Sequence, residues 1–581
     1  MSLAGSSAER AVEATKGGPN FLEDIFAELR RAEGRVVLRE IRGEQFASVS
    51  ARELLELIQR ARACIRSAGL EPGDRCGLLG PNSTHWVAFD LALIAERVIV
   101  VPLYARQAPQ ELAAMLKDCG ARAMFVSDRE LGDAVAAGWS DAPRRMVFAD
   151  ALRSASQPVA MTEAPKPRAE EEIAAIIYTS GTSGEPKGVC LSVANLNHML
   201  HVTTRWTDSL MVQSSESIRV FQYLPFNFAA SWMVLLSCLS RETTLTLSTD
   251  LTRLADEIRL AAPHYFLNVP TLLERVRRGA EENIARQPAP IRALYRKARA
   301  AFDHKTQGVP RALDSLWLEL GKRLLFRKIR ARFGPNLRAL VCGSAPLAPE
   351  TQRFFLMLDI PVLQAYGLTE TTGICTMDDP SRPGEPGFVG QAIPGMEMRL
   401  AENQEIVVRG PNIFPRYWNR PEETAKILRD GWLHTGDQGE VSARGNWRIT
   451  GRIKNLIILN SGHNIAPEPI EEKIAHELPL AQQVVVVGNG RGYLCALVTG
   501  PVQREDVRPA IDKINHDLPH YRQVREFTIL RDAFTPESGL LTPNGKLRRD
   551  AINARFASEI AAMYRQGATG GSLGANRGAG T

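Results

Sequence analysis

The chain lacks most features that mark secreted, zinc-binding or membrane-spanning proteins. Its 581 residues contain only eight cysteines, and none of them forms a CxxC pair. Scattered cysteines within apolar runs favour reduced thiols over a disulfide framework or a zinc site. The N-terminus has no continuous apolar segment, which argues against a signal peptide. No apolar run can span a bilayer, since Glu96 and Arg97 interrupt residues 91–103. We therefore expect a cytoplasmic protein.

The charge balance excludes little by itself. Lysine and arginine outnumber aspartate and glutamate by 71 to 65, which gives a formal net charge of +6. A mild positive charge suits anionic substrates or an anionic membrane surface, and it selects neither. No helix-turn-helix, zinc or base-stacking motif accompanies the basic residues, so we expect no nucleic-acid partner. The chain is too long for one core, and two or more domains are expected.

Apolar runs alternate with helical periods from residue 20 to residue 437. Strands are predicted at residues 77–79, 98–103 and 124–126, and helices at residues 51–68 and 110–119. This alternation is typical of α/β layers around a mainly parallel sheet. A smaller α/β unit follows, with strands predicted at residues 456–459, 483–487 and 494–498 and a helix at residues 507–517.

The most informative segment follows the apolar run at residues 173–177. It reads Tyr-Thr-Ser-Gly-Thr-Ser-Gly-Glu-Pro-Lys-Gly and combines four serines and threonines, three glycines and a lysine. Glycines let backbone N–H groups converge on an anion, and hydroxyls and a lysine add donors and charge. The segment is not a Walker loop, because Pro186 precedes the lysine and Gly188 follows it. It predicts a polyphosphate site rather than a plain surface turn. The candidate ligands are Thr179, Ser180, Gly181, Thr182, Ser183, Gly184 and Lys187.

This motif resembles the phosphate loop of the adenylate-forming superfamily, which includes acyl-CoA synthetases, luciferases and adenylation domains of peptide synthetases. The resemblance extends from about Phe46 to Tyr564, in the expected order and spacing. It implies an α/β protein whose large N-terminal domain has layered α/β subdomains and a small β subdomain, followed by a small mobile α/β domain. The expected parts are a flexible N-terminus (1–20), an ATP- and acyl-binding domain (21–453), a mobile domain carrying the catalytic lysine (454–565) and a disordered tail (566–581).

Two further segments complete the nucleotide site that the resemblance implies. Gly343, Ser344 and Ala345 follow a predicted strand and would border the adenine ring. In the segment 366–371, Tyr366 would stack on adenine beside Gly367, and Thr369 would touch the α-phosphate. Glu370, together with Thr179, would hold Mg²⁺. An aromatic face suits a base and a carboxylate suits a hard cation. A helix N-terminus capped by Thr369 is the alternative explanation of this segment.

A third segment, residues 431–437, ends on Asp437. The resemblance implies that Asp437 accepts both ribose hydroxyls, a bidentate task suited to a carboxylate. His434 is expected to be a structural histidine rather than a catalytic base. Arg452 would contact ribose or phosphate. Lys454 would be the pivot about which the small domain rotates.

The C-terminal part carries two more implied functional segments. Gly462, His463 and Asn464 would face the pantetheine arm of CoA, and Gly462 allows close approach. Turn-forming Thr-Pro and Asn-Gly pairs would present Lys546 on a loop that swings into the active site. In the family this lysine bridges the acyl carboxylate and the α-phosphate. An exposed basic tail is the alternative.

Several segments point to the long-chain fatty acyl-CoA synthetase branch: residues 408–414, 515–519, 535–547 and a basic helical insertion before Gly343. One departure concerns the acyl pocket. Most relatives carry Leu-Pro-x-x-His there, whereas this chain has Phe228 in place of the histidine. Phe226, Asn227 and Phe228 are the candidate pocket residues. A second departure is Arg416, where glycine is common.

The basic insertion covers residues 291–332. It holds twelve lysines and arginines against three acidic residues. Two explanations stay open for it: a solvated helical face, which the composition favours, or an amphipathic patch that contacts a membrane peripherally, at its inner face.

The resemblance implies an enzyme that uses ATP, Mg²⁺ and CoA. It would convert a fatty acid to acyl-AMP with release of pyrophosphate, and then to acyl-CoA. Lys546, Thr369 and Arg452 would be the catalytic residues. Two alternatives remain: a ligase that passes the acyl group to an acyl carrier protein, and a non-catalytic protein that binds acyl groups and nucleotides.

Overall fold

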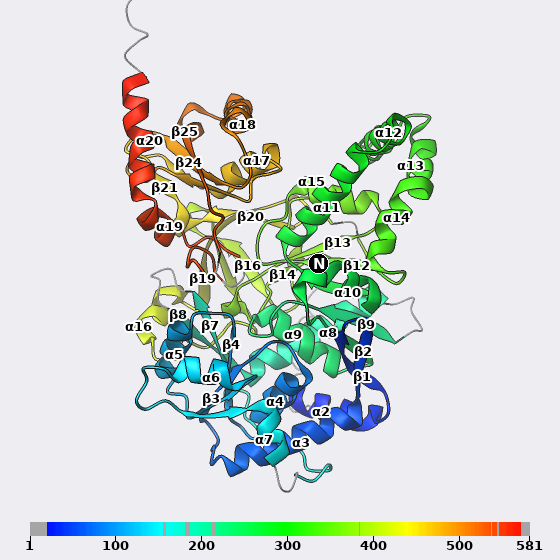
Figure 1. Cartoon of the computed structure of the whole chain (residues 1–581), viewed down its shortest axis with the longest axis vertical. Helices are drawn as coiled ribbons and strands as arrows, with labels where there is room; N and C mark the ends of the chain where they lie inside the picture. Colours follow the sequence, from blue (N-terminus) through cyan, green and yellow to red (C-terminus); the bar gives the residue numbers. More distant parts are fainter. Residues whose placement is uncertain are drawn as a thin grey trace, which may run out of the picture. The chain divides into compact units, whose positions relative to one another are not determined.

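The computed structural model describes residues 20–154, 159–180, 186–211, 217–382, 384–535, 537–542 and 545–570. Its contacts divide the chain into two units (Figure 1). The N-terminal unit comprises Met1–Arg399, Val407–His434 and Val441–Arg448. The C-terminal unit comprises Leu400–Ile406, Thr435–Glu440 and Ile449–Thr581. No helix among the described residues combines the length and apolar character needed to cross a membrane.

A six-stranded sheet carries the phosphate-loop motif. Its strand order is β6-β5-β3-β4-β7-β8, and only the last pair is antiparallel. The strands are β3 (Arg75–Leu79), β4 (Ile99–Leu103), β5 (Ala123–Val126), β6 (Arg144–Val147), β7 (Ile173–Ser180) and β8 (Pro186–Ser192). All five residues of β4 are buried, which fits a strand covered on both faces. The associated helices are α3 (Ala51–Ser67), α4 (Thr84–Ala95), α5 (Pro109–Asp118), α6 (Arg129–Ala136) and α7 (Phe148–Ser154).

A nine-stranded sheet carries the predicted adenine-side motifs. Its order is β15-β14-β13-β12-β11-β9-β10-β1-β2, with a parallel centre and antiparallel edges. The strands are β1 (Val36–Arg42), β2 (Gln45–Ser50), β9 (Ile218–Gln222), β10 (Thr243–Leu247), β11 (Tyr265–Asn268), β12 (Ala339–Cys342), β13 (Val362–Tyr366), β14 (Thr376–Met377) and β15 (Gln391–Ala392). In β12 and β13 every residue is buried. The carboxyl ends of these two parallel strands therefore meet at one edge, where ligands of α/β sheets commonly bind.

The remaining helices of the N-terminal unit follow clear local signals. The side chain of Asn20 caps α2 (Phe21–Ala32) in a capping box with Glu23, and Pro270 starts α11 at a position where its missing N–H is harmless. The others are α8 (Val193–Met211), α9 (Ala229–Leu239), α10 (Leu254–Ala261), α11 (Pro270–Ala285), α12 (Ala289–Thr306), α13 (Asp314–Gly321), α14 (Arg327–Arg330), α15 (Pro349–Met357) and α16 (Pro421–Ile427).

Five further strands contribute residues to one or both of the two units. They are β16 (Glu397–Leu400), β17 (Glu405–Arg409), β18 (Leu428–Arg429), β19 (Trp432–Val441) and β20 (Trp447–Arg452). The C-terminal unit also holds the hairpin of β21 (Ile457–Ile458) and β22 (Asn464–Ile465), and a sheet of β23 (Gln483–Val487), β24 (Leu494–Thr499) and β25 (Val524–Leu530). Its helices are α17 (Glu468–Glu477), α18 (Arg504–His516), α19 (Arg549–Arg555) and α20 (Ala557–Gly570).

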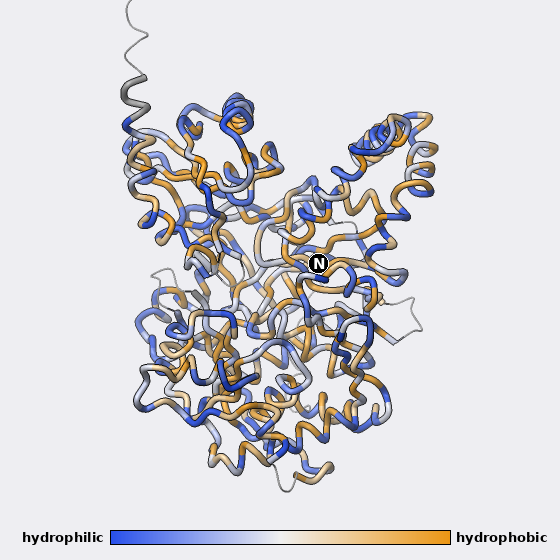
Figure 2. Tube along the Cα trace, in the orientation of Figure 1, coloured by the Kyte–Doolittle hydropathy of each residue, from blue (hydrophilic) through white to orange (hydrophobic). Residues whose placement is uncertain are grey.

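Figure 2 shows how the apolar residues follow these elements, and the C-terminal unit has apolar clusters of its own. The predicted α/β class and mainly parallel sheets are confirmed. Strands were predicted within a residue or two of β3, β4, β5, β23 and β24. The predicted strand at residues 456–459 is shorter, since β21 holds only two residues.

Candidate active site

The β7–β8 hairpin places the two described ends of the phosphate-loop motif side by side. Thr179 pairs with Lys187, and Tyr178 with Gly188. A side chain at Gly188 would lie 2.7 Å from Ile176, so only glycine fits there. Ser180 is the last residue of β7. The predicted ligands Gly181, Thr182, Ser183 and Gly184 lie outside the described residues.

Lys187 is held by a carboxylate and an aromatic ring. Its Nζ forms an ion pair with Glu423 and lies 5.4 Å from the centroid of the Tyr417 ring. The hydrogen bond from this ammonium lowers the pKa of Glu423. A lysine on an aromatic face gains a cation–π attraction as well. The side chain is only 18% exposed, so its direction is fixed before any ligand binds.

Tyr417 joins Lys187 to Glu370. Its hydroxyl donates a hydrogen bond of 2.6 Å to Oε1 of Glu370. Burial, together with the neighbouring carboxylate, raises the pKa of Tyr417, so the hydroxyl keeps its proton and acts as donor. The backbone of the same segment pairs with β8, because Trp418 N donates to Gly188 O over 2.7 Å. The structure thus connects the predicted phosphate and Mg²⁺ residues through one tyrosine.

The segment after β13 turns sharply. Gly367 packs so closely on the chain that a side chain there would lie 2.4 Å from Ile374 Cα. Thr369–Thr371 form a 3₁₀ turn, and Thr371 Oγ1 accepts a 2.9 Å bond from Leu368 N. Thr369 and Glu370 stay partly exposed on this turn. Thr369 is not the cap of a helix, since the turn's N-cap position is Leu368.

Asn412 holds the turn after β13 in place through three hydrogen bonds. Its Nδ2 donates to the backbone carbonyls of Thr371 and Ile374, at 2.9 Å each, and its backbone carbonyl accepts from Thr372 Oγ1 at 2.8 Å. Asn412 is fully buried. A buried amide with these partners positions the turn without touching a ligand.

Gly343, Ser344 and Ala345 follow β12 next to the end of β13. Gly343 N donates to Asn268 O over 3.2 Å, and a side chain there would lie 3.1 Å from Ala365 O. Ser344 has a φ of 75°, a left-handed conformation that is uncommon outside glycine. Tyr366, the last residue of β13, belongs to the adjacent strand. The two predicted adenine-side segments therefore share one edge of the sheet.

An apolar cavity of about 60 Å³ lies behind these motifs. Its walls use the strands and the turn that carry them, through Val341, Ala365, Thr372, Gly373 and Ile374. Helices α8 and α9 and strand β11 close the cavity with Met199, Thr203, Trp206, Thr207, Ala230, Met233, Val234, Ser237, Tyr265 and Leu267, and Met377 completes the lining. An apolar space that abuts a set of polar groups is the usual form of a small-molecule site.

The predicted pocket residues Phe226, Asn227 and Phe228 are not among the lining residues of this cavity. Phe226 is fully buried against Trp86, with ring centroids 5.0 Å apart, and its N–H donates to Asn82 Oδ1 over 3.0 Å. Phe228 is the N-cap residue of α9. The side chain of Arg416, the second departure, is exposed.

In the C-terminal unit, Asp437 and Arg452 form an ion pair. Arg452 Nε lies 2.8 Å from Asp437 Oδ1. The Asp437 side chain is only 2% exposed, whereas that of Arg452 is 34% exposed. The pair therefore sits at the surface with the carboxylate held in place. His434 is partly exposed on β19.

Lys454 is exposed in the short turn Ile453–Asn455. Gly462 lies in the β21–β22 hairpin with a φ of +82°, and a side chain there would meet nothing within 4 Å. His463 stacks on Tyr521 at 4.2 Å and shares a 2.9 Å hydrogen bond with Ser461. Asn464 is exposed in β22. The three predicted CoA-side residues thus lie together on one exposed hairpin.

Lys546 is exposed at the end of a tight turn. Thr542 N donates to Lys546 O over 2.7 Å, and Lys546 N donates to Thr542 Oγ1 over 3.0 Å. A buried ion pair anchors the chain after this turn: both Arg549 nitrogens contact Glu471, at 2.8 and 2.6 Å. The main chain at Lys546 is therefore held by two hydrogen bonds to Thr542.

Comparison with known proteins decides the family. A model of the AMP-binding enzyme family matches residues 26–418, and a model of the AMP-binding enzyme C-terminal domain matches residues 454–568. The chain belongs to the AMP-binding enzyme family. The predicted superfamily is thereby confirmed, as is the presence of a separate C-terminal domain.

Two relatives from Mycobacterium tuberculosis illustrate this membership. The long-chain-fatty-acid–CoA ligase FadD15 is 28% identical over 585 residues, which cover 93% of this chain and 96% of the relative. The putative fatty-acid–CoA ligase fadD11 is 30% identical over 432 residues, which cover 68% of this chain and 74% of that relative.

Solved structures share the fold. The adenylation domain of a carboxylate reductase from Mycobacterium chelonae superposes with a TM-score of 0.75 at 22% identity, covering 96% of this chain and 93% of that domain. An o-succinylbenzoate CoA synthetase from Bacillus subtilis, solved with ATP and magnesium ion, superposes with a TM-score of 0.69 at 19% identity, covering 92% and 99%.

Three positioning residues of this AMP-binding enzyme escaped the sequence reasoning: Tyr417, Glu423 and Asn412. Asn412 and Tyr417 lie within or just after the segment that indicated the long-chain branch. Glu423 carries no motif signal, since an acidic residue in the first turn of α16 has an ordinary capping explanation.

The donor set fits a magnesium ion. The described residues contain no cluster of three or more His, Cys, Asp or Glu side chains that could enclose a metal. Glu370 and the Thr179 hydroxyl are hard oxygen donors, and Mg²⁺ is commonly bound by one or two carboxylates together with substrate phosphates. Glu370 keeps one carboxylate oxygen beyond the one that accepts from Tyr417.

Proposed function

We propose that the chain activates a fatty acid with ATP, releases pyrophosphate, and transfers the acyl group from AMP to CoA. The observation that carries the proposal is the Lys187–Tyr417–Glu370 connection beside an apolar cavity built from the same two strands. The printed names of the two mycobacterial relatives support a fatty acid and CoA as substrates.

In the first step, a carboxylate oxygen of the acid attacks the α-phosphorus of ATP. The bond from that phosphorus to the bridging oxygen breaks, and pyrophosphate leaves. The nucleophile is already ionised at neutral pH, so no general base is needed. Lys187 and Thr179 hold the phosphates, Thr369 donates to the α-phosphate, and Lys546 offsets the developing charge. Mg²⁺, held through Glu370 and Thr179, would neutralise phosphate oxygens.

In the second step, the sulfur of CoA attacks the acyl carbonyl carbon. The carbon–oxygen bond to AMP breaks, AMP leaves, and the thiol proton passes to water. We assign Lys454 as the pivot that withdraws Lys546, and Gly462, His463 and Asn464 as the residues facing the thiol arm. Their location on one exposed hairpin supports this role. Asp437 and Arg452 would hold the ribose.

The cavity is assigned to the acyl chain. Its volume of about 60 Å³ matches only two or so water molecules, so a long chain requires the lining to open. Met199 and Met233 are the side chains best suited to move, because methionine is unbranched and flexible. The long-chain assignment therefore depends on a lining that yields to the substrate.

Pyrophosphate release with ATP, Mg²⁺ and a panel of fatty acids, with and without CoA, tests the proposal. Release that becomes catalytic only with CoA is the expected result. A stoichiometric burst that CoA leaves unchanged would instead identify a ligase for an acyl carrier protein. No release with any acid would favour the non-catalytic alternative.

A further inference from the structure

Helices α12 and α13 form a hairpin that projects from the other helices of the N-terminal unit (Figure 1). Together with the short helical turns that follow α13, this hairpin is here called the arm (residues 289–333). The chain continues from α13 through a π-helical turn, Lys322–Phe326, into α14. Gly321 brings the two helices together, since a side chain there would lie 2.8 Å from Ala298 Cβ. Lys297 Nζ lies 3.9 Å from the Trp317 ring across the hairpin.

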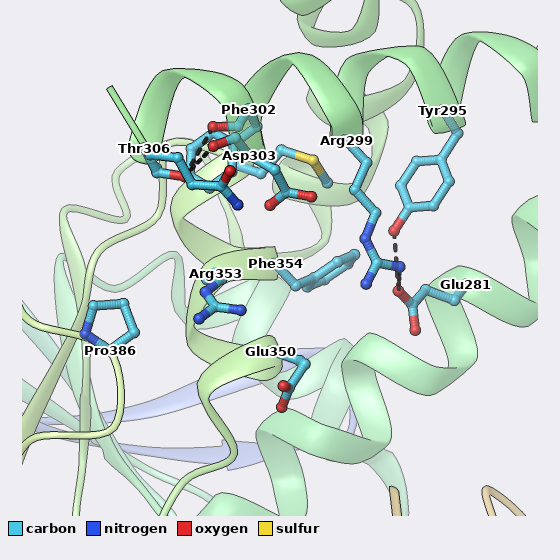
Figure 3. Close-up of a pocket in the computed structure, with 12 residues that line it drawn as sticks. Glu281, Tyr295, Arg299, Phe302, Asp303, Thr306, Glu350, Arg353, Phe354 and Pro386 are labelled. Carbon is cyan, nitrogen blue, oxygen red and sulfur yellow. Dashed lines mark hydrogen bonds and ion pairs between the residues drawn. The ribbon is translucent and has the colours of Figure 1, made fainter. Parts of the chain in front are cut away.

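The base of the arm is anchored to α11. Tyr295 on α12 donates a 3.1 Å hydrogen bond to Glu281 on α11, and Figure 3 shows this contact beside a polar cavity of about 360 Å³. Arg299 also contacts Glu281, at 3.5 Å. The charges lining that cavity are mixed in sign, so the cavity selects no ligand charge. These contacts with Glu281 fix the position of α12 against α11.

The outer surface of the arm exposes large apolar side chains. Val309, Leu313, Leu316 and Leu324 are 59%, 57%, 51% and 56% exposed. Nine large apolar side chains are exposed among the described residues, and these four fall within sixteen consecutive positions. With the partly exposed Leu320, the leucines at 313, 316, 320 and 324 follow helical spacing and form one stripe. Figure 2 shows the apolar residues of α13 within this hairpin.

Basic side chains surround this stripe. Lys305, Arg311, Arg323, Arg327 and Lys328 are exposed. The segment 291–332 carries twelve lysines and arginines against Asp303, Asp314 and Glu319. Asp314 is already engaged by His304 at 3.2 Å and by Arg311 N at 2.7 Å. Lys322 and Arg323 are paired as well, with Asp359 at 2.8 Å and with Glu319 at 3.9 Å. The basic residues of the segment nevertheless outnumber its acidic residues by nine, so the arm carries a net positive charge.

We propose that the leucine stripe of the arm docks on a lipid surface that carries anionic headgroups. An apolar stripe bordered by lysines and arginines inserts its leucines at the headgroup boundary while the cations contact the headgroups. Charge complementarity selects this occupant over a second copy of the chain, because two arms of the same strong positive charge repel each other. Only the biological reason for docking rests on the proposed function: fatty acids partition into bilayers, where a docked enzyme would bind them.

The test is flotation of the full chain with phosphatidylcholine vesicles, with and without about 30% phosphatidylglycerol. The unmodified chain should float with the anionic vesicles and release at high salt. Leu313→Ser/Leu316→Ser/Leu324→Ser should weaken partitioning about tenfold or more, because each exposed leucine loses its burial in lipid. Lys305→Gln/Arg311→Gln/Arg327→Gln should abolish the preference for anionic vesicles.

Leu251→Ser/Leu260→Ser/Leu480→Ser is the matched control, since it removes three exposed leucines outside the arm. The control should bind as the unmodified chain does. Leu324→Glu is a second variant in case the triple variant folds poorly, and it should lose binding too. Three results would overturn the proposal: an unmodified chain that stays unbound, arm variants that bind normally, or a dimer without vesicles that the leucine substitutions dissociate.

Pyrophosphate release with detergent-dispersed fatty acid separates this proposal from the proposed function. The arm variants should keep the rate of the unmodified chain in that assay. Absence of release from the unmodified chain would count against the proposed function and leave the vesicle result to stand by itself.

Discussion

The hydroxyl of Tyr417 donates a 2.6 Å hydrogen bond to Glu370, while the ring of the same residue lies 5.4 Å from the ammonium of Lys187. These partners lie 47 and 230 positions apart from Tyr417 in the sequence, and one side chain holds both. Tyr417 thus sets the separation of the cation that we propose binds phosphate and the carboxylate that we propose binds Mg²⁺. Its two contacts can be removed one at a time.

Replacing Tyr417 by phenylalanine removes the hydrogen bond and keeps the ring. A hydrogen bond to a charged group contributes about 1.5–3 kcal/mol, so we expect the pyrophosphate release rate at limiting Mg²⁺ to fall about 10- to 100-fold. Raising the Mg²⁺ concentration should restore part of the loss, because Glu370 has lost its orientation and not its charge. Tyr417→Leu, which also removes the ring beside Lys187, should be worse and should raise the KM for ATP. Wild-type kinetics in the phenylalanine variant would remove Tyr417 from the site.

Lys546 should matter for one half-reaction. In Lys546→Ala, acyl-AMP formation should fall about 100-fold or more, as expected when a charge that stabilises the transition state is lost. Thioester formation from supplied acyl-AMP should fall much less. Lys473→Ala, an exposed lysine on α17, is the control and should leave both rates unchanged. Equal losses in the two half-reactions would contradict the assigned role.

The apolar cavity predicts chain-length selectivity. Ala230→Phe fills the space between α9 and the turn after β13, where the Ala230 backbone lies 3.4 Å from a side-chain position at Gly373. Overpacking a fitted space is costly, so activity with long acids should fall at least about tenfold while short acids are spared. Leu235→Met, a nearly volume-conserving change on α9 outside the cavity lining, is the control. The kcat/KM values across a series of acids measure the effect, and a uniform loss at every length would place the acyl chain elsewhere.

The sequence predicted what local chemistry encodes. Buried strands such as β4 and β12 stand out as short apolar runs, and the nucleotide motifs stand out because each combines residues that are unusual together. The Tyr417–Glu370 contact had no such signal, because it depends on how the segment after Phe414 packs against β8. The cavity also had none, since its lining comes from α8, α9, β11, β12 and β13 together.

The arm shows a different limit of sequence reasoning. Leucines at 313, 316, 320 and 324 have the spacing of a buried helix face, and periodicity alone assigns them to a core. The structure buries Leu318 and Phe326 instead and leaves Leu313, Leu316 and Leu324 exposed. Which face of an amphipathic helix is covered depends on its neighbours, and the sequence of the helix does not contain them.

Asp90 provides a test of stability that is independent of the site. It is fully buried in α4, where Trp232 Nε1 donates to Oδ2 over 2.9 Å and the other carboxylate oxygen has no hydrogen-bond partner among the described residues. Burial raises its pKa to about 7. Between about pH 4 and pH 7, the folded chain keeps this proton while the unfolded chain releases it. The unfolding free energy therefore falls as the pH rises through that window.

Asp90→Asn removes this pH-dependent cost and keeps an acceptor for Trp232. When the pH is raised from 5 to 8, the unfolding free energy of the variant should rise relative to that of the unmodified chain by about 2–3 kcal/mol. Each unit of pKa difference corresponds to about 1.4 kcal/mol. Calorimetric Tm values of both proteins at the two pH values measure the gain, and only the change with pH matters, because the amide's own cost is the same at each. Asp141→Asn, at an exposed position, is the control for loss of charge. A difference that stays constant with pH would mean that Asp90 ionises in the folded chain as readily as in water.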